Sequence, residues 1–97
     1  MNFSERHVVV IGAGLGGLSA AISLASEGFS VELIEKNDKV GGKLNILVKD
    51  GFSFDLGPSI LTMPHIFAAL FTRVGKNIED YVRFEPVEPH WRNFFCG

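Results

Sequence analysis

A glycine-rich turn between an apolar run and a helix-like segment most constrains how this chain can fold. Residues 8–36 read VVVIGAGLGGLSAAISLASEGFSVELIEK, with the hexad GAGLGG at 12–17 and a second apolar run that ends at Glu35. A GxGxxG hexad that follows a strand, opens a helix and precedes an acidic residue by about 20 positions is typical of a dinucleotide-binding βαβ unit. The sequence therefore predicts an α/β fold with a Rossmann-like βαβ unit.

The residues of this motif have separable physical roles. Gly12 lets the strand turn sharply, Gly14 leaves room for a pyrophosphate beside the backbone, and Gly17 allows the helix to pack closely on the strand. The phosphates then lie at the positive end of the helix. The carboxylate of Glu35 is expected to accept hydrogen bonds from the hydroxyls of the adenosine ribose. The alternative is an ordinary tight strand–helix turn.

Three elements follow from the pattern of apolar residues in this stretch. Residues 7–11 and 30–34 are predicted to be parallel strands, the first covered on both faces. Residues 15–26 are predicted to be the crossover helix, with Gly28 at its end. This arrangement brings Gly14 and Glu35 to the same carboxyl edge of the sheet, where ligands bind.

A second glycine motif, Gly41-Gly42-Lys43, follows the predicted ribose-binding residue. The doublet permits close backbone approach, and Lys43 adds a cation nearby. Together with the first motif, it indicates more phosphate contact than a nicotinamide site requires, and it favours FAD. The alternative is a plain loop with a solvated lysine.

The next residues alternate in a way that predicts a hairpin, with strands at 44–48 and 52–54. The loop after it, residues 55–60, contains Gly57, Pro58 and Ser59, which suit a backbone segment packed against a ring or a phosphate. A simple turn explains this loop equally well.

The last third of the chain predicts a helix over 64–74, a helical turn over 77–81 capped by Asn77, an edge strand over 82–88 and a further strand over 91–95. The 64–74 helix carries an apolar stripe. Core packing or a domain interface is the favoured explanation of this stripe. A wall of a lipid-substrate channel or a membrane-dipping surface is the alternative.

Composition limits the class of protein. A chain of 97 residues forms about one small domain, and its 46% hydrophobic content with nine Phe suggests apolar surface that meets further chain. We therefore expect the N-terminal part of a longer protein. The net charge of −2 gives no electrostatic reason to expect nucleic acid. The polar residues 1–7 do not resemble a signal peptide, and no apolar run is long enough to span a bilayer.

No catalytic residue can be assigned from the sequence. His90 beside Trp91 suits a packed or hydrogen-bonded histidine better than a catalytic one, and Arg92 suits an ion pair. The single cysteine, Cys96, has no evident activating neighbour. The sequence offers no nucleophile–base pair, no paired carboxylates and no metal-ligand cluster, so no metal is expected.

Several motifs together resemble a known family. The strand–GAGLGG–helix–Glu35 unit, Gly41-Gly42-Lys43 and especially GFSFDLGPSILTMP at 51–64 closely resemble the N-terminus of the bacterial carotenoid desaturases, the phytoene-desaturase-like flavoproteins. The resemblance covers nearly the whole chain. With DYV at 80–82 and HWRNFF at 90–95, it is strongest to the branch of C30 carotenoid terminal oxidases.

The resemblance implies a set of FAD-binding residues. The pyrophosphate would be held at the glycine hexad, the adenosine ribose at Glu35, and the flavin or its ribityl chain near the loop after the hairpin. Lys43 stands where many relatives have Arg, and its ammonium cannot make the bidentate contact of a guanidinium. The cofactor-binding residues implied in this way are Gly12, Gly14, Leu15, Gly16, Gly17, Glu35, Lys36, Gly42, Lys43, Gly57, Pro58, Ser59 and Ile60.

The resemblance also implies an organisation and an activity. Residues 1–63 would be the N-terminal part of the FAD-binding domain of a two-domain flavoprotein, and residues 64–97 the start of an apolar substrate domain. The full-length protein would oxidise the terminal methyl group of a C30 carotenoid such as diaponeurosporene to an aldehyde, at a cytoplasmic membrane surface where it binds peripherally. The alternatives are a desaturase of diapophytoene or phytoene, a non-catalytic FAD-binding module and a nicotinamide reductase.

Overall fold

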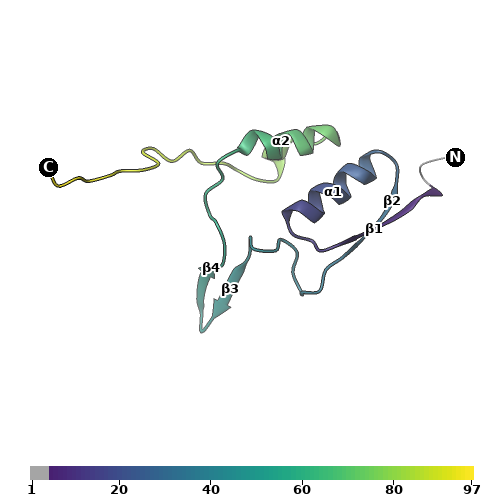
Figure 1. The fold of residues 1–97 in the computed structure, drawn as a ribbon, viewed down its shortest axis with the longest axis horizontal. Helices are drawn as coiled ribbons and strands as arrows, with labels where there is room; N and C mark the ends of the chain where they lie inside the picture. The colour runs from purple at the N-terminus through teal and green to yellow at the C-terminus, as the bar shows by residue number, and fades with distance from the viewer. Residues whose placement is uncertain (1–4) are drawn as a thin grey trace.

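A computed structural model describes residues 5–97. Residues 1–4 lie outside the described part, and the expectation that residues 1–7 are not a signal peptide falls partly on them. The chain begins with a βαβ unit: β1 (His7–Ile11), α1 (Leu15–Ser26) and β2 (Ser30–Ile34), as predicted (Figure 1). The two strands are parallel, with His7 opposite Ser30 and Ile11 opposite Ile34. The ladder continues past β1, because Gly12 N–H donates to the Ile34 carbonyl at 2.7 Å.

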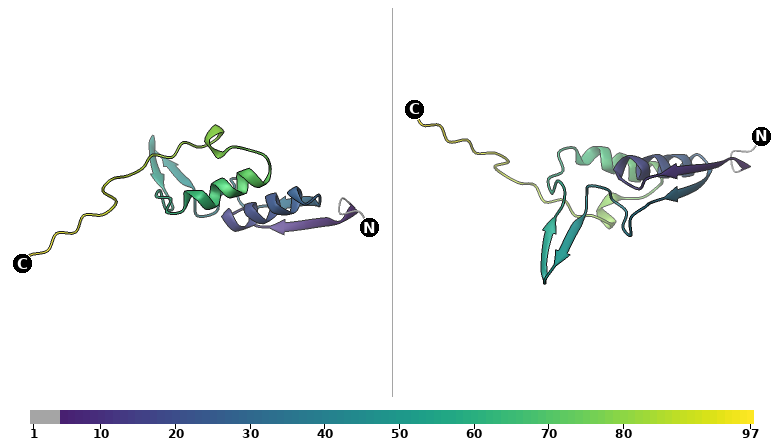
Figure 2. Two further views of the ribbon diagram at one scale, coloured as in Figure 1. Left: turned by 90° about the horizontal axis from the view of Figure 1, so that it is seen from above. Right: turned by 60° about the horizontal axis from the view of Figure 1, so that its bottom comes forward.

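Helix α1 covers one face of the β1–β2 sheet (Figure 2). Alternate strand residues such as Val10 and Leu33 are half-buried beneath it, while those on the opposite face are exposed, with Ile11 84% exposed. The prediction that β1 is covered on both faces is therefore wrong for residues 5–97. A continuous apolar run does not show which face receives a covering layer, because both faces read alike in the sequence.

Helix α1 ends as the sequence predicts. Gly28 has a φ of 93° and its N–H donates to the Ala25 carbonyl at 3.0 Å, while Phe29 N–H donates to Leu24 at 3.2 Å. This pair of bonds is a Schellman motif, which satisfies carbonyls that the helix itself leaves free. The chain is thereby turned back toward the start of β2.

A separate antiparallel hairpin follows, formed by β3 (Ile46–Lys49) and β4 (Phe52–Asp55). It projects away from the βαβ unit (Figure 1). The predicted start of β3 at residue 44 is wrong by two residues, because Leu44 belongs to a turn in which its N–H donates to the Gly41 carbonyl at 3.1 Å.

The predicted helix and helical turn are both present. Helix α2 (Pro64–Arg73) lies beside α1, and the Arg73 guanidinium donates to the Ser23 hydroxyl at 3.1 Å. The 3₁₀ turn η2 (Ile78–Asp80) packs on α2, and the side chain of Asn77 accepts from Glu79 N–H. Leu70 and Phe71 of the apolar stripe are half-buried and line one hollow together with Ile22 of α1, in agreement with the packing explanation.

The predicted strands over 82–88 and 91–95 are wrong, because residues 82–97 contain no strand and run away from the other elements (Figure 2). A strand needs a hydrogen-bonded neighbour, and no other segment of residues 5–97 pairs with this one. The radius of gyration is 17.9 Å, compared with about 13 Å for a compact domain of 100 residues. The structure is therefore open, with an ordered βαβ unit at one end.

Candidate dinucleotide site

The site begins at the N-terminus of α1. Gly14 is the N-cap residue, and it has no side chain with which to cap the helix. The first turn also contains no acidic residue. The first N–H groups of α1 and the helix dipole suit an anion such as a pyrophosphate.

The close approach predicted at Gly17 is present. A Cβ at this position would collide with the carbonyl oxygen of Gly12 and would lie 3.7 Å from a methyl group of Val10. Any larger residue would push α1 away from β1. Gly17 therefore fixes the distance between the helix and the turn that precedes it.

The carboxylate of Glu35 is held by the glycine turn and by its own loop. Its Oε2 accepts from Ala13 N–H at 2.9 Å, and its Oε1 accepts from the backbone N–H of Asn37 at 3.1 Å and the side-chain amide at 3.3 Å. These donors, Ala13 first and Asn37 second, lower the pKa of Glu35 below its ordinary value. A carboxylate has about four acceptor positions, so it still has capacity for a ribose hydroxyl.

Ala13 is a residue of the candidate site that sequence reasoning missed. It is 0% exposed; its N–H binds Glu35, and its carbonyl accepts from Gly41 N–H at 2.7 Å. The residue joins the first glycine motif to the second through its two backbone groups. Its small side chain is a weak signal in the sequence, because backbone hydrogen bonding does not depend on residue type.

The second glycine motif docks on the first. A Cβ at Gly42 would lie 3.1 Å from the Cα of Gly14, and Gly42 has a φ of 62°. Both the contact and the backbone conformation favour glycine. The two motifs therefore form one continuous backbone surface at the carboxyl edge of the β1–β2 sheet.

The loop after the hairpin docks on the second motif in turn. A Cβ at Gly57 would collide with the carbonyl oxygen of Lys43. Gly57 therefore has the same steric role as Gly17, but the carbonyl that it approaches, that of Lys43, is more distant in the sequence. As a result, backbone contacts run from Gly14 through Gly42 and Lys43 to Gly57.

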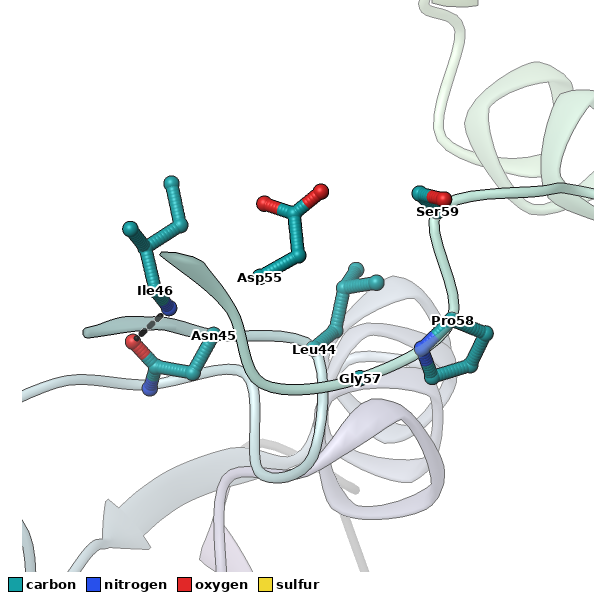
Figure 3. Close-up of a pocket in the computed structure, with 7 residues that line it drawn as sticks. All are labelled: Leu44, Asn45, Ile46, Asp55, Gly57, Pro58 and Ser59. Carbon is teal, nitrogen blue, oxygen red and sulfur yellow. Dashed lines mark hydrogen bonds between the residues drawn. The ribbon is translucent and has the colours of Figure 1, made fainter. Parts of the chain in front are cut away.

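A pocket of about 250 Å³ opens at the base of the hairpin, beside Gly57 (Figure 3). We call it the hairpin pocket. It is lined by Leu44, Asn45, Ile46, Asp55, Gly57, Pro58 and Ser59. Asn45 and Asp55, which sequence reasoning did not select, belong to it because the pairing of β3 with β4 places their segments side by side.

The remaining predicted residues are less closely gathered. Leu15 is 47% exposed and Ile60 is 61% exposed, and Ile60 does not line the hairpin pocket. Gly16 and the side chain of Lys43 are exposed, whereas Lys36 contributes its backbone N–H and its charge to the lowered pKa of Glu35. The structure therefore gathers the glycine backbone and Glu35 tightly and leaves the larger side chains open.

Residues considered for other chemistry lie away from this site. His90, Arg92 and Cys96 belong to the exposed C-terminal segment. Within residues 5–97, no three His, Cys, Asp or Glu side chains come together in a way that could hold a metal ion. Neither helix of the described chain is both long enough and apolar enough to cross a bilayer.

A parallel βαβ unit with a glycine turn, an open helix N-terminus and an acidic residue at the end of the second strand defines a Rossmann-like dinucleotide site. The chain belongs to the family described as NAD(P)-binding Rossmann-like domain, which matches residues 10–81. The predicted α/β fold class is thereby confirmed.

Comparison with individual proteins shows which members of the wider family this chain resembles. The chain is 80% identical over 96 residues to a 4,4'-diapolycopene oxygenase of Methylomonas sp, covering 98% of this chain and 19% of that protein. It is 54% identical over 94 residues to a 4,4'-diaponeurosporene oxygenase of Staphylococcus haemolyticus, covering 97% and 19%. The resemblance to the carotenoid oxidase branch is confirmed, and the chain spans about 19% of the length of these relatives.

Proposed function

We propose that this chain provides the dinucleotide-binding part of an FAD-dependent carotenoid oxidoreductase, and that the full-length gene product oxidises the terminal methyl group of a C30 carotenoid to an aldehyde. The observation that carries the proposal is the line of backbone contacts from Gly14 through Gly42 and Lys43 to Gly57. Three glycine segments that pack without side chains between them offer an extended backbone cradle. Glycine backbone without side chains lets the pyrophosphate of a dinucleotide approach closely, as FAD binding needs.

The charge of Glu35 supports FAD over a 2′-phosphorylated nicotinamide cofactor. A glutamate is already ionised at neutral pH, and the lowered pKa of Glu35 keeps its carboxylate charged further into the acidic range. An ionised carboxylate accepts hydrogen bonds from ribose hydroxyls and repels a 2′-phosphate. FAD carries an adenosine ribose with free hydroxyls, so it suits this residue.

The residues that would hold FAD follow from the geometry. The open N–H groups at the start of α1 would bind the pyrophosphate, Glu35 would bind the adenosine ribose, and the segment around Gly57 would support the flavin half. FAD, when bound, supplies the redox chemistry of the reaction. The part of this chain is to bind and orient the cofactor, and we assign none of its residues as catalytic.

The names of the relatives support the substrate class. One is named as an oxygenase of 4,4'-diapolycopene and the other as an oxygenase of 4,4'-diaponeurosporene. We extend to this chain an apolar C30 carotenoid as substrate, peripheral binding at the cytoplasmic face of the membrane and a substrate domain that begins near residue 64. The exposed apolar residues of the C-terminal segment, among them Trp91 at 83% and Phe95 at 88%, suit such surroundings.

The test is product analysis in cells that make C30 carotenoids. The full-length gene product is supplied with diaponeurosporene or diapolycopene under oxygen-18 gas, and the products are analysed by mass spectrometry. We expect a terminal aldehyde that carries the heavy isotope. Additional double bonds without incorporated oxygen would instead identify a desaturase, and FAD binding without any carotenoid product would identify a binding module.

A further inference from the structure

Asn37 lies two residues after Glu35 and holds the carboxylate of Glu35 from one side. It donates two hydrogen bonds to Oε1 of Glu35, from its backbone N–H at 3.1 Å and from its side-chain amide at 3.3 Å. The other oxygen, Oε2, accepts one hydrogen bond, from Ala13 N–H at 2.9 Å. The two oxygens of this carboxylate therefore accept different numbers of hydrogen bonds.

The remaining acceptor capacity of Glu35 lies on Oε2. Each oxygen of a carboxylate has about two lone-pair positions. The two bonds from Asn37 fill those of Oε1, whereas the single bond from Ala13 leaves one position open on Oε2. A ribose presents two neighbouring hydroxyl groups, each of which can donate one hydrogen bond. Only one of these two hydroxyl groups finds a free acceptor position on Glu35.

Two of the three donors to this carboxylate come from the backbone. Ala13 is buried, and its carbonyl accepts from Gly41 N–H at 2.7 Å, so the position of its own N–H is set by the docking of the two glycine motifs. The backbone N–H of Asn37 is present with almost any residue at that position. The side-chain amide of Asn37 is therefore the one donor of the three that depends on residue type and that a substitution can remove.

We propose that Asn37 is a positioning residue for Glu35: its side-chain amide occupies Oε1, so that the carboxylate accepts only one of the two hydroxyl groups of the adenosine ribose, at Oε2. This inference rests on the proposed function, in which the ribose belongs to FAD. The same geometry applies to the adenosine half of a nicotinamide dinucleotide, because both cofactors contain an ADP unit. Asn37 thereby decides how many hydroxyl groups Glu35 recognises.

The experiment removes each ribose hydroxyl in turn. ADP, 2′-deoxy-ADP and 3′-deoxy-ADP are titrated by calorimetry into the full-length gene product from which the bound cofactor has been removed. The variant is Asn37→Ala, which keeps the backbone N–H and removes the side-chain amide. Its matched control is Val40→Ala, a neutral truncation in the same loop between β2 and β3, at a residue that is 59% exposed.

In the natural protein, we expect the loss of one hydroxyl to weaken binding about tenfold, because that hydroxyl donates to a charged acceptor, and the loss of the other to weaken it less than about twofold. In Asn37→Ala, a position on Oε1 becomes free, so the loss of the second hydroxyl should now weaken binding about threefold or more. Val40→Ala should bind all three ligands as the natural protein does. A purely structural change in the loop would weaken the three ligands by one common factor and leave their ratios unchanged.

Two results would overturn the role of Asn37. One is an equal effect of the two deoxy ligands in the natural protein, whether large or absent, and the other is a set of affinity ratios in Asn37→Ala that matches the natural protein. Failure of the proposed function is distinguishable, because ADP is common to both kinds of cofactor. If the natural protein retains NAD in place of FAD, the FAD proposal fails, and the ADP series still decides the role of Asn37. If ADP does not bind, both proposals fail.

Discussion

Gly17 and Gly57 meet the same steric limit in two different regions of the molecule. Each has a backbone carbonyl where a Cβ would be, from Gly12 in the first case and from Lys43 in the second. Gly17 lies in the first turn of α1, inside the βαβ unit, whereas Gly57 lies in a loop between the hairpin and α2. The first contact is local in sequence, and the second joins two loops that only the fold brings together.

This difference shows what each glycine controls. A side chain at Gly17 disturbs the packing of a helix on a strand, which the whole βαβ unit shares. A side chain at Gly57 disturbs the docking of one loop on another, which has less buried structure to lose. We therefore expect Gly17 to govern folding and Gly57 to govern the shape of the cofactor cradle.

The largest effect is expected for Gly17→Ala. Its Cβ collides with the Gly12 carbonyl, so α1 must shift, at a cost of about 3 kcal/mol in the free energy of unfolding. Urea denaturation of the full-length gene product measures this change. Stability equal to that of the natural protein would show that α1 does not pack as closely as the structure indicates.

Gly57→Ala should have a smaller effect on stability and a clear effect on cofactor binding. The exposed loop can move away from Lys43, so we expect a loss of about 1 kcal/mol in the free energy of unfolding, at the low end for overpacking. The displaced loop should weaken FAD binding more than ADP binding when each is titrated by calorimetry into full-length protein from which the bound cofactor has been removed. A loss of stability as large as that of Gly17→Ala would remove the distinction between the two glycines.

Glu35→Gln tests a long-range contact made by a side chain. Because the pKa of Glu35 is lowered in the folded state, its stabilising contribution is present above the ordinary carboxyl pKa of about 4.3. That contribution disappears as the pH falls through the lowered value. The natural protein should therefore melt above the variant at pH 7, and the difference should shrink in melting curves recorded toward pH 3. A difference that is constant with pH would contradict the role of the ionised carboxylate.

The smallest effect is expected for Gly51→Asn, the control for both glycine variants. Gly51 lies in the hairpin turn with a φ of 81°, and a Cβ there meets no atom within 4 Å. Asparagine tolerates this conformation, so the free energy of unfolding should change by less than about 0.5 kcal/mol. A larger loss would mean that the hairpin responds to any substitution, and the Gly57 result would then need a different explanation.

The parts of the fold that the sequence predicts are those with local causes. The bounds of β1, α1 and β2 agree with prediction, because periodicity, the glycine turn and the Gly28 cap all act over short distances. The strands predicted over 82–88 and 91–95 are wrong, because strand formation depends on a partner that a local pattern does not reveal. One face of β1 is exposed for a similar reason, because the apolar run of the strand does not reveal whether another layer covers that face.

The candidate site likewise has features that the sequence predicts and features that it does not. The roles of Gly14, Gly17 and Glu35 follow from a motif whose spacing reflects its geometry. The contact between Gly57 and Lys43, the two backbone bonds of Ala13 and the polar lining of the hairpin pocket depend on tertiary contacts. Residue type gives little signal of these features, so they required the structure.

The most direct test of one continuous cradle is the cofactor that remains bound to the purified full-length gene product. The cofactor is released by heat, identified by mass spectrometry and quantified for the natural protein, Gly14→Val and Gly57→Ala. We predict about one FAD per chain in the natural protein, none in Gly14→Val because a side chain occupies the space of the pyrophosphate, and a reduced amount in Gly57→Ala. Full FAD content in Gly14→Val, or a cofactor other than FAD in the natural protein, would contradict the account.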